Sequence, residues 1–105
     1  MAGEATLNKN VVTALNKLPG VFVKKRWAGP GQKGQVDITG IACIEGLGVR
    51  IELEGKLPGE KPTRLQLYWL KKWEQYGAIT GVYHTVEQAV AIVDAHIQHH
   101  CRKDR

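Results

Sequence analysis

The spacing of apolar side chains along the chain predicts three helices. In residues 4–18 the apolar positions fall three or four residues apart, and Pro19-Gly20 ends the pattern. Residues 63–76 are apolar almost all round, and Thr63 followed three residues later by Gln66 has the form of a capping box at a helix start. A third stretch opens at Thr85 and carries an apolar stripe at the same spacing.

Four shorter stretches, residues 21–28, 35–44, 49–56 and 78–83, have the alternation or β-branched content of strands. A glycine-rich loop at 29–34 and a turn at 45–48 predict that the first three strands pair as an antiparallel meander. Gly40 inside the second stretch indicates a bulge or a bend. The third and fourth strands flank a helix, which predicts a right-handed parallel crossover. The expected fold class is α/β, a single domain in the order α-β-β-β-α-β-α with a mixed four-stranded sheet flanked by helices.

The length and composition agree with one soluble domain. At 105 residues the chain can build one hydrophobic core but not two, so residues 1–105 are expected to form one domain. No apolar run approaches the roughly 20 residues of a membrane helix, and the amino-terminus lacks the pattern of a secretory signal. We therefore expect a cytoplasmic protein of a bacterial or phage-infected cell, without a membrane partner and with Cys43 and Cys101 as reduced thiols.

The formal net charge of +5 favours an anionic partner. Lys24, Lys25 and Arg26 directly precede Trp27, an arrangement that suits a phosphate backbone with a base or sugar stacked on the ring. Solvated lysines that protect an edge strand from aggregation are an equally good interpretation.

One predicted strand carries all its charges on one face. In residues 49–56 the alternation of side chains places a charged row opposite an apolar row, and the charged row consists of Arg50, Glu52, Glu54 and Lys56. Such a strand is either half-exposed with weak ion pairs or part of an active site. Asp37, near the start of the neighbouring predicted strand, would supply a second carboxylate beside Glu54 if this is an active site. Carboxylates hold hard divalent cations, and a lysine beside them can orient or deprotonate an attacking water, as phosphodiester hydrolysis requires.

Four segments favour the active-site interpretation because they resemble a known family. These are residues 34–40 (GQVDITG), 51–66 (IELEGKLPGEKPTRLQ), 76–78 (YGA) and 81–82 (GV). Together they resemble the VRR-NUC (virus-type replication-repair nuclease) domain of the PD-(D/E)XK nuclease superfamily, over nearly the whole chain. The run that follows Glu54-Gly55-Lys56 and ends in Pro62-Thr63 and Gln66 is the most specific part of the match. The resemblance implies a restriction-endonuclease-like core with the same order of elements.

The resemblance also implies roles for individual residues around a Mg²⁺ or Mn²⁺ ion. Asp37 matches the aspartate of the family's P-D element, Glu54 the acidic metal ligand of its E-x-K element, and Lys56 the catalytic lysine. The backbone carbonyl of Gly55 would be a further metal ligand, and Glu4 on the first helix would complete the metal shell.

Gln66 matches the family's glutamine at the start of the helix beside the site, and it is implied as a catalytic residue. Both Gln66 and Glu4 also have simpler interpretations. Acidic residues are favoured in the first turn of any helix, and Gln66 can serve as the capping partner of Thr63.

The chain departs from the family pattern at two positions. Val36 stands where proline is usual, which costs no ligand. Gly55 stands where an apolar β-branched residue is usual, which is expected to loosen the strand where its carbonyl must be held. A second register, with Glu52 as the acidic ligand, would leave the lysine missing. The spacing to Gln66 and the position of Pro58-Gly59 fit only the Glu54-Gly55-Lys56 register.

By this resemblance we expect a metal-dependent, structure-specific DNA endonuclease acting on branched DNA such as Holliday junctions or flaps. The residues expected to bind flanking phosphates are Lys24, Lys25, Arg26 and Arg64. The apolar 63–76 helix is either buried on both sides or offers one side to a homodimer, and stand-alone members of this type resemble two-fold junction-resolving nucleases. The alternatives are a catalytically silent nuclease-fold module that binds DNA or protein, and a sequence-specific restriction-type nuclease.

Overall fold

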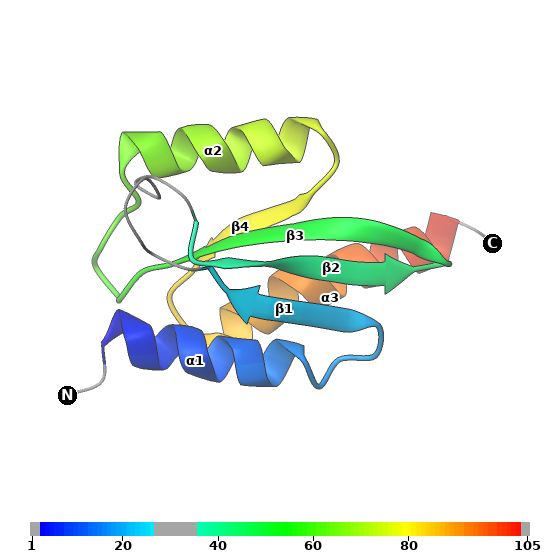
Figure 1. Cartoon of the computed structure of the whole chain (residues 1–105), viewed down its shortest axis with the longest axis horizontal. Coiled ribbons are helices and arrows are strands. Elements are labelled where there is room, and N and C mark those ends of the chain that lie inside the picture. The colour runs from blue at the N-terminus through cyan, green and yellow to red at the C-terminus, as the bar shows by residue number, and fades with distance from the viewer. Residues whose placement is uncertain (1–2, 27–35, 104–105) are drawn as a thin grey trace.

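The computed structural model describes residues 3–26 and 36–103, which form one mixed sheet with three helices (Figure 1). The helices are α1 (Glu4–Leu15), α2 (Arg64–Gln75) and α3 (Val86–Lys103). The strands are β1 (Val21–Lys25), β2 (Ile38–Ile44), β3 (Leu47–Gly55) and β4 (Ile79–Tyr83), and they lie in the order β1-β2-β3-β4. β1, β2 and β3 pair antiparallel, whereas β4 runs parallel to β3. This confirms the predicted α/β class and element order.

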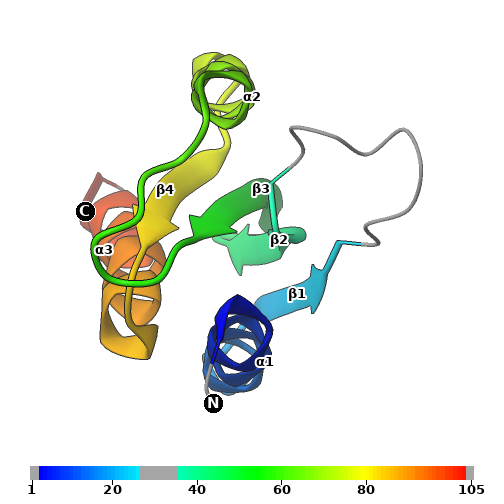
Figure 2. The same cartoon turned by 90° about the vertical axis from the view of Figure 1, so that its left-hand side faces the viewer.

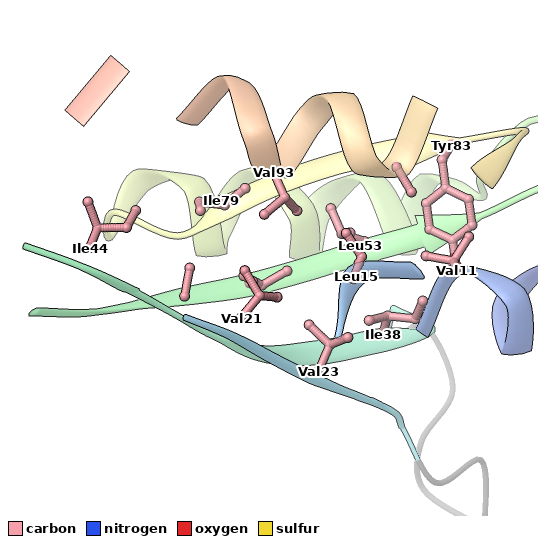
Figure 3. Close-up of a cluster of buried hydrophobic side chains, with 13 residues drawn as sticks. Val11, Leu15, Val21, Val23, Ile38, Ile44, Leu53, Ile79, Tyr83 and Val93 are labelled. Carbon is pink, nitrogen blue, oxygen red and sulfur yellow. The ribbon is translucent and has the colours of Figure 1, made fainter. Parts of the chain in front are cut away.

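The hydrophobic core lies between one face of the sheet and helices α1 and α3, while α2 covers part of the opposite face (Figures 1 and 3). Side chains that alternate along the strands point into this core and meet the apolar stripes of the two helices. Its fully buried members include Val11, Leu15, Ile38, Ile51, Leu53, Ile79, Tyr83 and Val93.

The amino-terminal ends of all three helices lie at one end of the sheet (Figures 1 and 2). β3 and β4 finish at the same end, and β2 begins there. Because backbone N–H groups are unsatisfied at helix amino-termini, this end of the molecule favours anions such as phosphate.

The predicted helix starts at 63 and 85 are confirmed in atomic detail. The Thr63 hydroxyl accepts from the Gln66 N–H at 3.1 Å, and the Gln66 side chain accepts from the Thr63 N–H at 2.9 Å, which completes the predicted capping box. The Thr85 hydroxyl likewise accepts from the Gln88 N–H at 3.1 Å. Gly77, with a φ of 98°, follows the end of α2 as predicted.

Several element boundaries differ from those predicted. Helix α1 ends at Leu15 instead of residue 18, because the Asn16 side chain leaves the helix and exchanges two hydrogen bonds with the backbone of Val23, at 2.8 and 3.1 Å. The turn before β3 is shorter than predicted, since Glu45 and Gly46 adopt φ values of 53° and 80° and join the strands as a two-residue hairpin.

Strands β1 and β2 are shorter than predicted at the ends that flank residues 27–35. β1 ends at Lys25 and β2 begins at Ile38. The predicted strand residues 27, 28 and 35 and the glycine-rich loop at 29–34 lie outside the described residues, as do the side chains of the carboxyl-terminal residues from 100 onward, Cys101 among them. Cys43 is exposed and forms no disulfide.

Helix α2 is not buried on both sides. Leu70 is its buried residue, whereas several large apolar side chains are largely in solvent: Leu65 (43% exposed), Leu67 (50%), Tyr68 (54%) and, just after the helix, Tyr76 (80%). Of the two predictions left open by the sequence, burial on both sides is wrong. Within the described part of the chain, no helix combines the length and apolarity needed to cross a membrane.

Gly40 marks a close approach of strands, not the predicted bulge. It pairs in regular register with Val23 on one side and Ile51 on the other. A Cβ atom at this position would lie 2.1 Å from the carbonyl oxygen of Phe22 and 2.6 Å from the Cα of Val23. Neither backbone atom can move without breaking the ladder, so only glycine fits.

We therefore expect Gly40→Ala to lower the free energy of unfolding by about 2 kcal/mol through overpacking. Gly48→Ala is the matched control, because a Cβ there meets only ordinary contact, with the Ile41 Cγ2 at 3.5 Å. Urea denaturation of both variants checks the expectation. Equal midpoints for Gly40→Ala and the unchanged protein would show that the strands separate easily at this point.

Candidate metal centre

The sheet register brings the two predicted acidic ligands together. Ile38 pairs with Leu53, so Asp37, one residue before β2, lies across from Glu54 near the end of β3. The backbone N–H of Gly55 donates to Asp37 Oδ2 at 3.0 Å. This bond ties the aspartate to the strand that carries the E-x-K residues, as the sequence predicted for adjacent strands.

Glu54 is a fully buried carboxylate with neither oxygen in a hydrogen bond. The Lys56 ammonium lies 3.4 Å from its Oε2, within ion-pair range. Burial and then repulsion by Asp37 raise the pKa of Glu54 from its ordinary 4.5 to about 7, although Lys56 acts in the opposite direction. An ionised carboxylate in this position is costly unless a cation compensates it.

Two further acids lie near this pair. Burial and a hydrogen bond with Glu60 raise the pKa of Glu4, which also feels the charges of Lys56 and Asp37. The carboxylate of Glu60 accepts from the Leu57 N–H at 3.0 Å, and this bond lowers its pKa. The sequence did not single out Glu60, which lies in the loop between Lys56 and α2, where acids are common.

The donor atoms suit a hard divalent cation, because they are carboxylate oxygens and two of them, on Glu54, are buried without a partner. Among the described residues, however, no group of three or more His, Cys, Asp or Glu side chains is assembled as a metal site. Asp37 and Glu54 form the core of the candidate centre, and Glu4 does not complete a three-carboxylate group with them. Its carboxyl group instead interacts with that of Glu60.

Gly55 does not loosen β3, contrary to the expectation from the sequence. A Cβ atom here would lie 2.3 Å from Asn8 Oδ1 and 2.7 Å from the ring of Tyr83, so neighbouring side chains already fill the space. Tyr83 is the parallel partner of Gly55, and its hydroxyl donates to Asn8 Oδ1 at 2.5 Å. Asn8 follows Glu4 by one turn on α1, so this hydrogen bond fixes the start of α1 against the end of β4.

Tyr83 is fully buried, and its pKa is raised by burial and by the carboxylates of Asp37, Glu54 and Glu4. Its hydroxyl therefore keeps its proton and acts as a hydrogen-bond donor. Neither Tyr83 nor Asn8 is predicted from the sequence as a site residue. Both could be found only from the pairing of Gly55 on β3 with the large Tyr83 side chain on β4. This pairing is known once the register of the two strands is known, and the sequence alone does not give the register.

Glu52 is not a solvent-exposed member of a charged row. It is fully buried and accepts hydrogen bonds from Thr39 Oγ1 at 2.5 Å and Arg50 Nε at 2.8 Å, and it pairs with Arg26. The interpretation of β3 as a half-exposed strand is wrong, since Glu54 is buried as well. Glu52 is occupied by three donors, and Glu54 is the carboxylate that faces Lys56.

The four predicted DNA-binding residues differ in exposure to solvent. Lys24, Lys25 and Arg64 are exposed, and Arg64 opens α2. Arg26 is instead held by Glu52, with 19% of its side chain exposed. Gln66 is used in the α2 cap, and its additional catalytic role stays a prediction.

His84 lies beside the E-x-K segment. Its Nδ1 is 3.1 Å from the carbonyl oxygen of Lys56 and 3.3 Å from that of Leu57. Both neighbours are acceptors, so Nδ1 carries the hydrogen. The ring thus joins the end of β4 to the end of β3, next to the lysine that the sequence predicts as catalytic.

No protein-family model and no curated protein matches this chain.

The buried state of Glu54 predicts a specific pH dependence of stability. Because the pKa is about 7 in the folded protein and 4.5 is its ordinary value, the folded state binds the proton more tightly. The contribution of Glu54 to the free energy of unfolding is therefore full below that range and lost as the pH rises through it. Glu54→Gln removes this loss, so we expect it to gain about 2 kcal/mol relative to the unchanged protein between about pH 5 and pH 8.

Thermal and urea unfolding across this pH range measure the difference. Glu74→Gln, which removes an exposed carboxylate on α2, controls for the loss of one negative charge. A constant difference between Glu54→Gln and the unchanged protein at all pH values would contradict the burial of an ionisable Glu54.

Proposed function

We propose that this protein is a divalent-metal-dependent nuclease that hydrolyses phosphodiester bonds of DNA, with Asp37 and Glu54 as the ligands of Mg²⁺ or Mn²⁺. The observation that carries the proposal is the buried Glu54 carboxylate, which has no hydrogen bond, repels Asp37 and lies beside Lys56. A structural carboxylate at such a position is normally satisfied by donors, as Glu52 is. The resemblance of residues 34–40 and 51–66 to the VRR-NUC domain supports the same function.

The side chains divide the chemistry between them. A divalent ion would supply a lowered pKa for the attacking water and neutralise negative charge that develops on the phosphate. Asp37 and Glu54 hold the charge that attracts the cation, and the Gly55 N–H keeps Asp37 in place. Lys56 orients the water or stabilises the phosphate oxygens, because its ammonium group lies next to Glu54 at the open end of the sheet.

The surface around the site suits a nucleic-acid backbone. Lys9, Lys24 and Lys25 line a groove of about 500 Å³ between α1 and β1. The groove also contains Ala5, in the first turn of α1. Together with the exposed Arg64 at the start of α2 and the three helix amino-termini at one end of the sheet (Figure 2), these lysines would offer favourable contacts to phosphates.

The exposed apolar side of α2 supports a homodimer. Leu67 and Tyr68 are about half exposed there, and Trp69 packs edge-on against the Tyr68 ring. Aromatic residues are enriched at protein interfaces. A two-fold pair of sites suits cleavage of paired strands in branched DNA, and so we propose junctions or flaps as substrates.

One observation favours the catalytically silent alternative, a nuclease-fold module that binds DNA without cutting it. Within the described ranges the carboxylates are not assembled as a group of three at a metal site. The two functions differ in one measurable property, because a silent module binds branched DNA but neither takes up Mn²⁺ nor cuts.

Cleavage assays test the enzymatic proposal directly. With Mg²⁺ or Mn²⁺ we expect cutting of a four-way junction or a flap in preference to a linear duplex or a single strand. Asp37→Asn and Lys56→Met should reduce the rate by at least about 100-fold while DNA binding persists, since each removes a group that acts on the reacting atoms. Lys17→Met, two residues beyond the carboxyl end of α1, is the control for loss of an exposed lysine. Unchanged cutting by Asp37→Asn would refute the assignment.

Sedimentation analysis tests the homodimer. We expect the unchanged protein to sediment as a dimer at micromolar concentration and Leu67→Glu to be a folded monomer, because a charge in an apolar interface is costly. Gln98→Glu adds the same charge at an exposed position on α3, across the sheet, and should stay dimeric. A monomeric unchanged protein would rule out this role for α2.

A further inference from the structure

Arg26 connects the two ends of the segment that separates β1 from β2. Its backbone N–H donates to the carbonyl oxygen of Asp37 at 2.8 Å, and its Nε donates to the carbonyl oxygen of Val36 at 3.1 Å. The other end of the same guanidinium pairs with the carboxylate of Glu52 in the centre of the sheet. Arg26 thus binds the backbone of residues 36 and 37 and connects it to Glu52 on β3.

Glu52 is a rigid anchor for this arginine. It is fully buried, and its second oxygen accepts from Thr39 on β2 and from Arg50 on β3. Arg50 is itself held over the Trp73 ring of α2, with its guanidinium 4.5 Å from the ring centroid. A buried carboxylate with several directional partners has one well-defined position, and removal of one partner leaves an uncompensated charge.

Asp37 needs such support because of its position in the chain. It lies just outside the β2 ladder, which begins at Ile38, so no strand pairing holds it. Its own side chain contacts β3 through the Gly55 N–H. The orientation of the carboxylate therefore depends on its backbone, which is bonded to Arg26.

We propose that Arg26 and Glu52 form a positioning pair that sets the place of Asp37 in the metal centre, and that Arg26 does not serve as a contact to DNA. The proposal rests on the function proposed above, and it replaces the phosphate-binding role that the sequence predicted for Arg26. Lys24, two residues earlier on the same face of β1, keeps the phosphate-binding role, because it is exposed and lines the basic groove.

The two roles predict opposite results for Arg26 and Lys24. Loss of a residue that orients a metal ligand typically reduces metal affinity by about 10- to 100-fold. Arg26→Ala should therefore weaken Mn²⁺ binding in calorimetry by about ten-fold or more, and leave the affinity of the metal-free protein for a four-way junction within about two-fold. Lys24→Ala should reduce DNA affinity and its salt dependence without changing Mn²⁺ uptake.

A double variant addresses the risk that Arg26→Ala fails to fold because Glu52 loses a partner. Arg26→Met combined with Glu52→Gln removes both charges and leaves Thr39 and Arg50 to bond the new amide. We expect this protein to fold and still to bind Mn²⁺ weakly. Arg26→Lys, which keeps the charge but cannot reach Val36 and Glu52 with two planar donors, should fall between the double variant and the unchanged protein.

Hydrogen exchange separates the positioning role from the nuclease proposal. The Gly55 amide donates to Asp37, so its exchange in the metal-free protein reports whether the aspartate is held in place. Faster Gly55 exchange in the double variant, with Leu53 exchange unchanged, supports the positioning pair even if the unchanged protein takes up no Mn²⁺, a result that would end the nuclease proposal alone. Unchanged Gly55 exchange, or Mn²⁺ affinity equal to that of the unchanged protein, would overturn the positioning pair.

Discussion

The fold keeps one carboxylate, that of Glu54, out of water without giving it a hydrogen bond. β3 lies inside the sheet between β2 and β4, and residues 51–55 at its end are buried on both faces. The Glu54 carboxylate therefore loses its hydration. The loss disfavours the ionised form and raises the pKa of Glu54. The free-energy cost of burying this carboxylate is offset by the hydrophobic core beneath the sheet and by the ion pair with Lys56. A divalent cation would remove the same cost, which is why we connect this residue with metal binding.

Glu52 and Glu54 show how the surroundings separate a structural from a functional carboxylate. The two residues lie on the same face of the same strand and are equally buried. Glu52 accepts hydrogen bonds from three side chains, two of them positively charged, which compensates its charge within the protein. Glu54 has Lys56 at ion-pair distance and two oxygens without hydrogen bonds. Strand alternation in the sequence treats them alike, and only the residues across the sheet make them different.

The sequence predicted those features whose causes are local. The capping box at Thr63 and the order of the strands depend on residues near one another in the chain, and both are confirmed. The opposition of Asp37 and Glu54 followed from the expected meander. The early end of α1, the tight packing at Gly55 and the pairing of Arg26 depend on partners far away in the sequence. The alternation of side chains along a strand shows which residues share a face of the sheet. It does not show which other residues cover that face.

The packing of Gly55 also bears on whether the site can be active. A glycine inside a strand normally weakens it, and a weakened strand at this point would favour a degenerate nuclease. Here the ring of Tyr83 occupies the space that a side chain at position 55 would fill, and its hydroxyl is bonded to Asn8 on α1. The Tyr83 ring on β4 thus fills the space that a side chain on β3 would otherwise occupy, and no cavity is left at Gly55. The departure at Gly55 is therefore no argument against catalysis, and the question rests on how Glu54 and Asp37 respond to a cation.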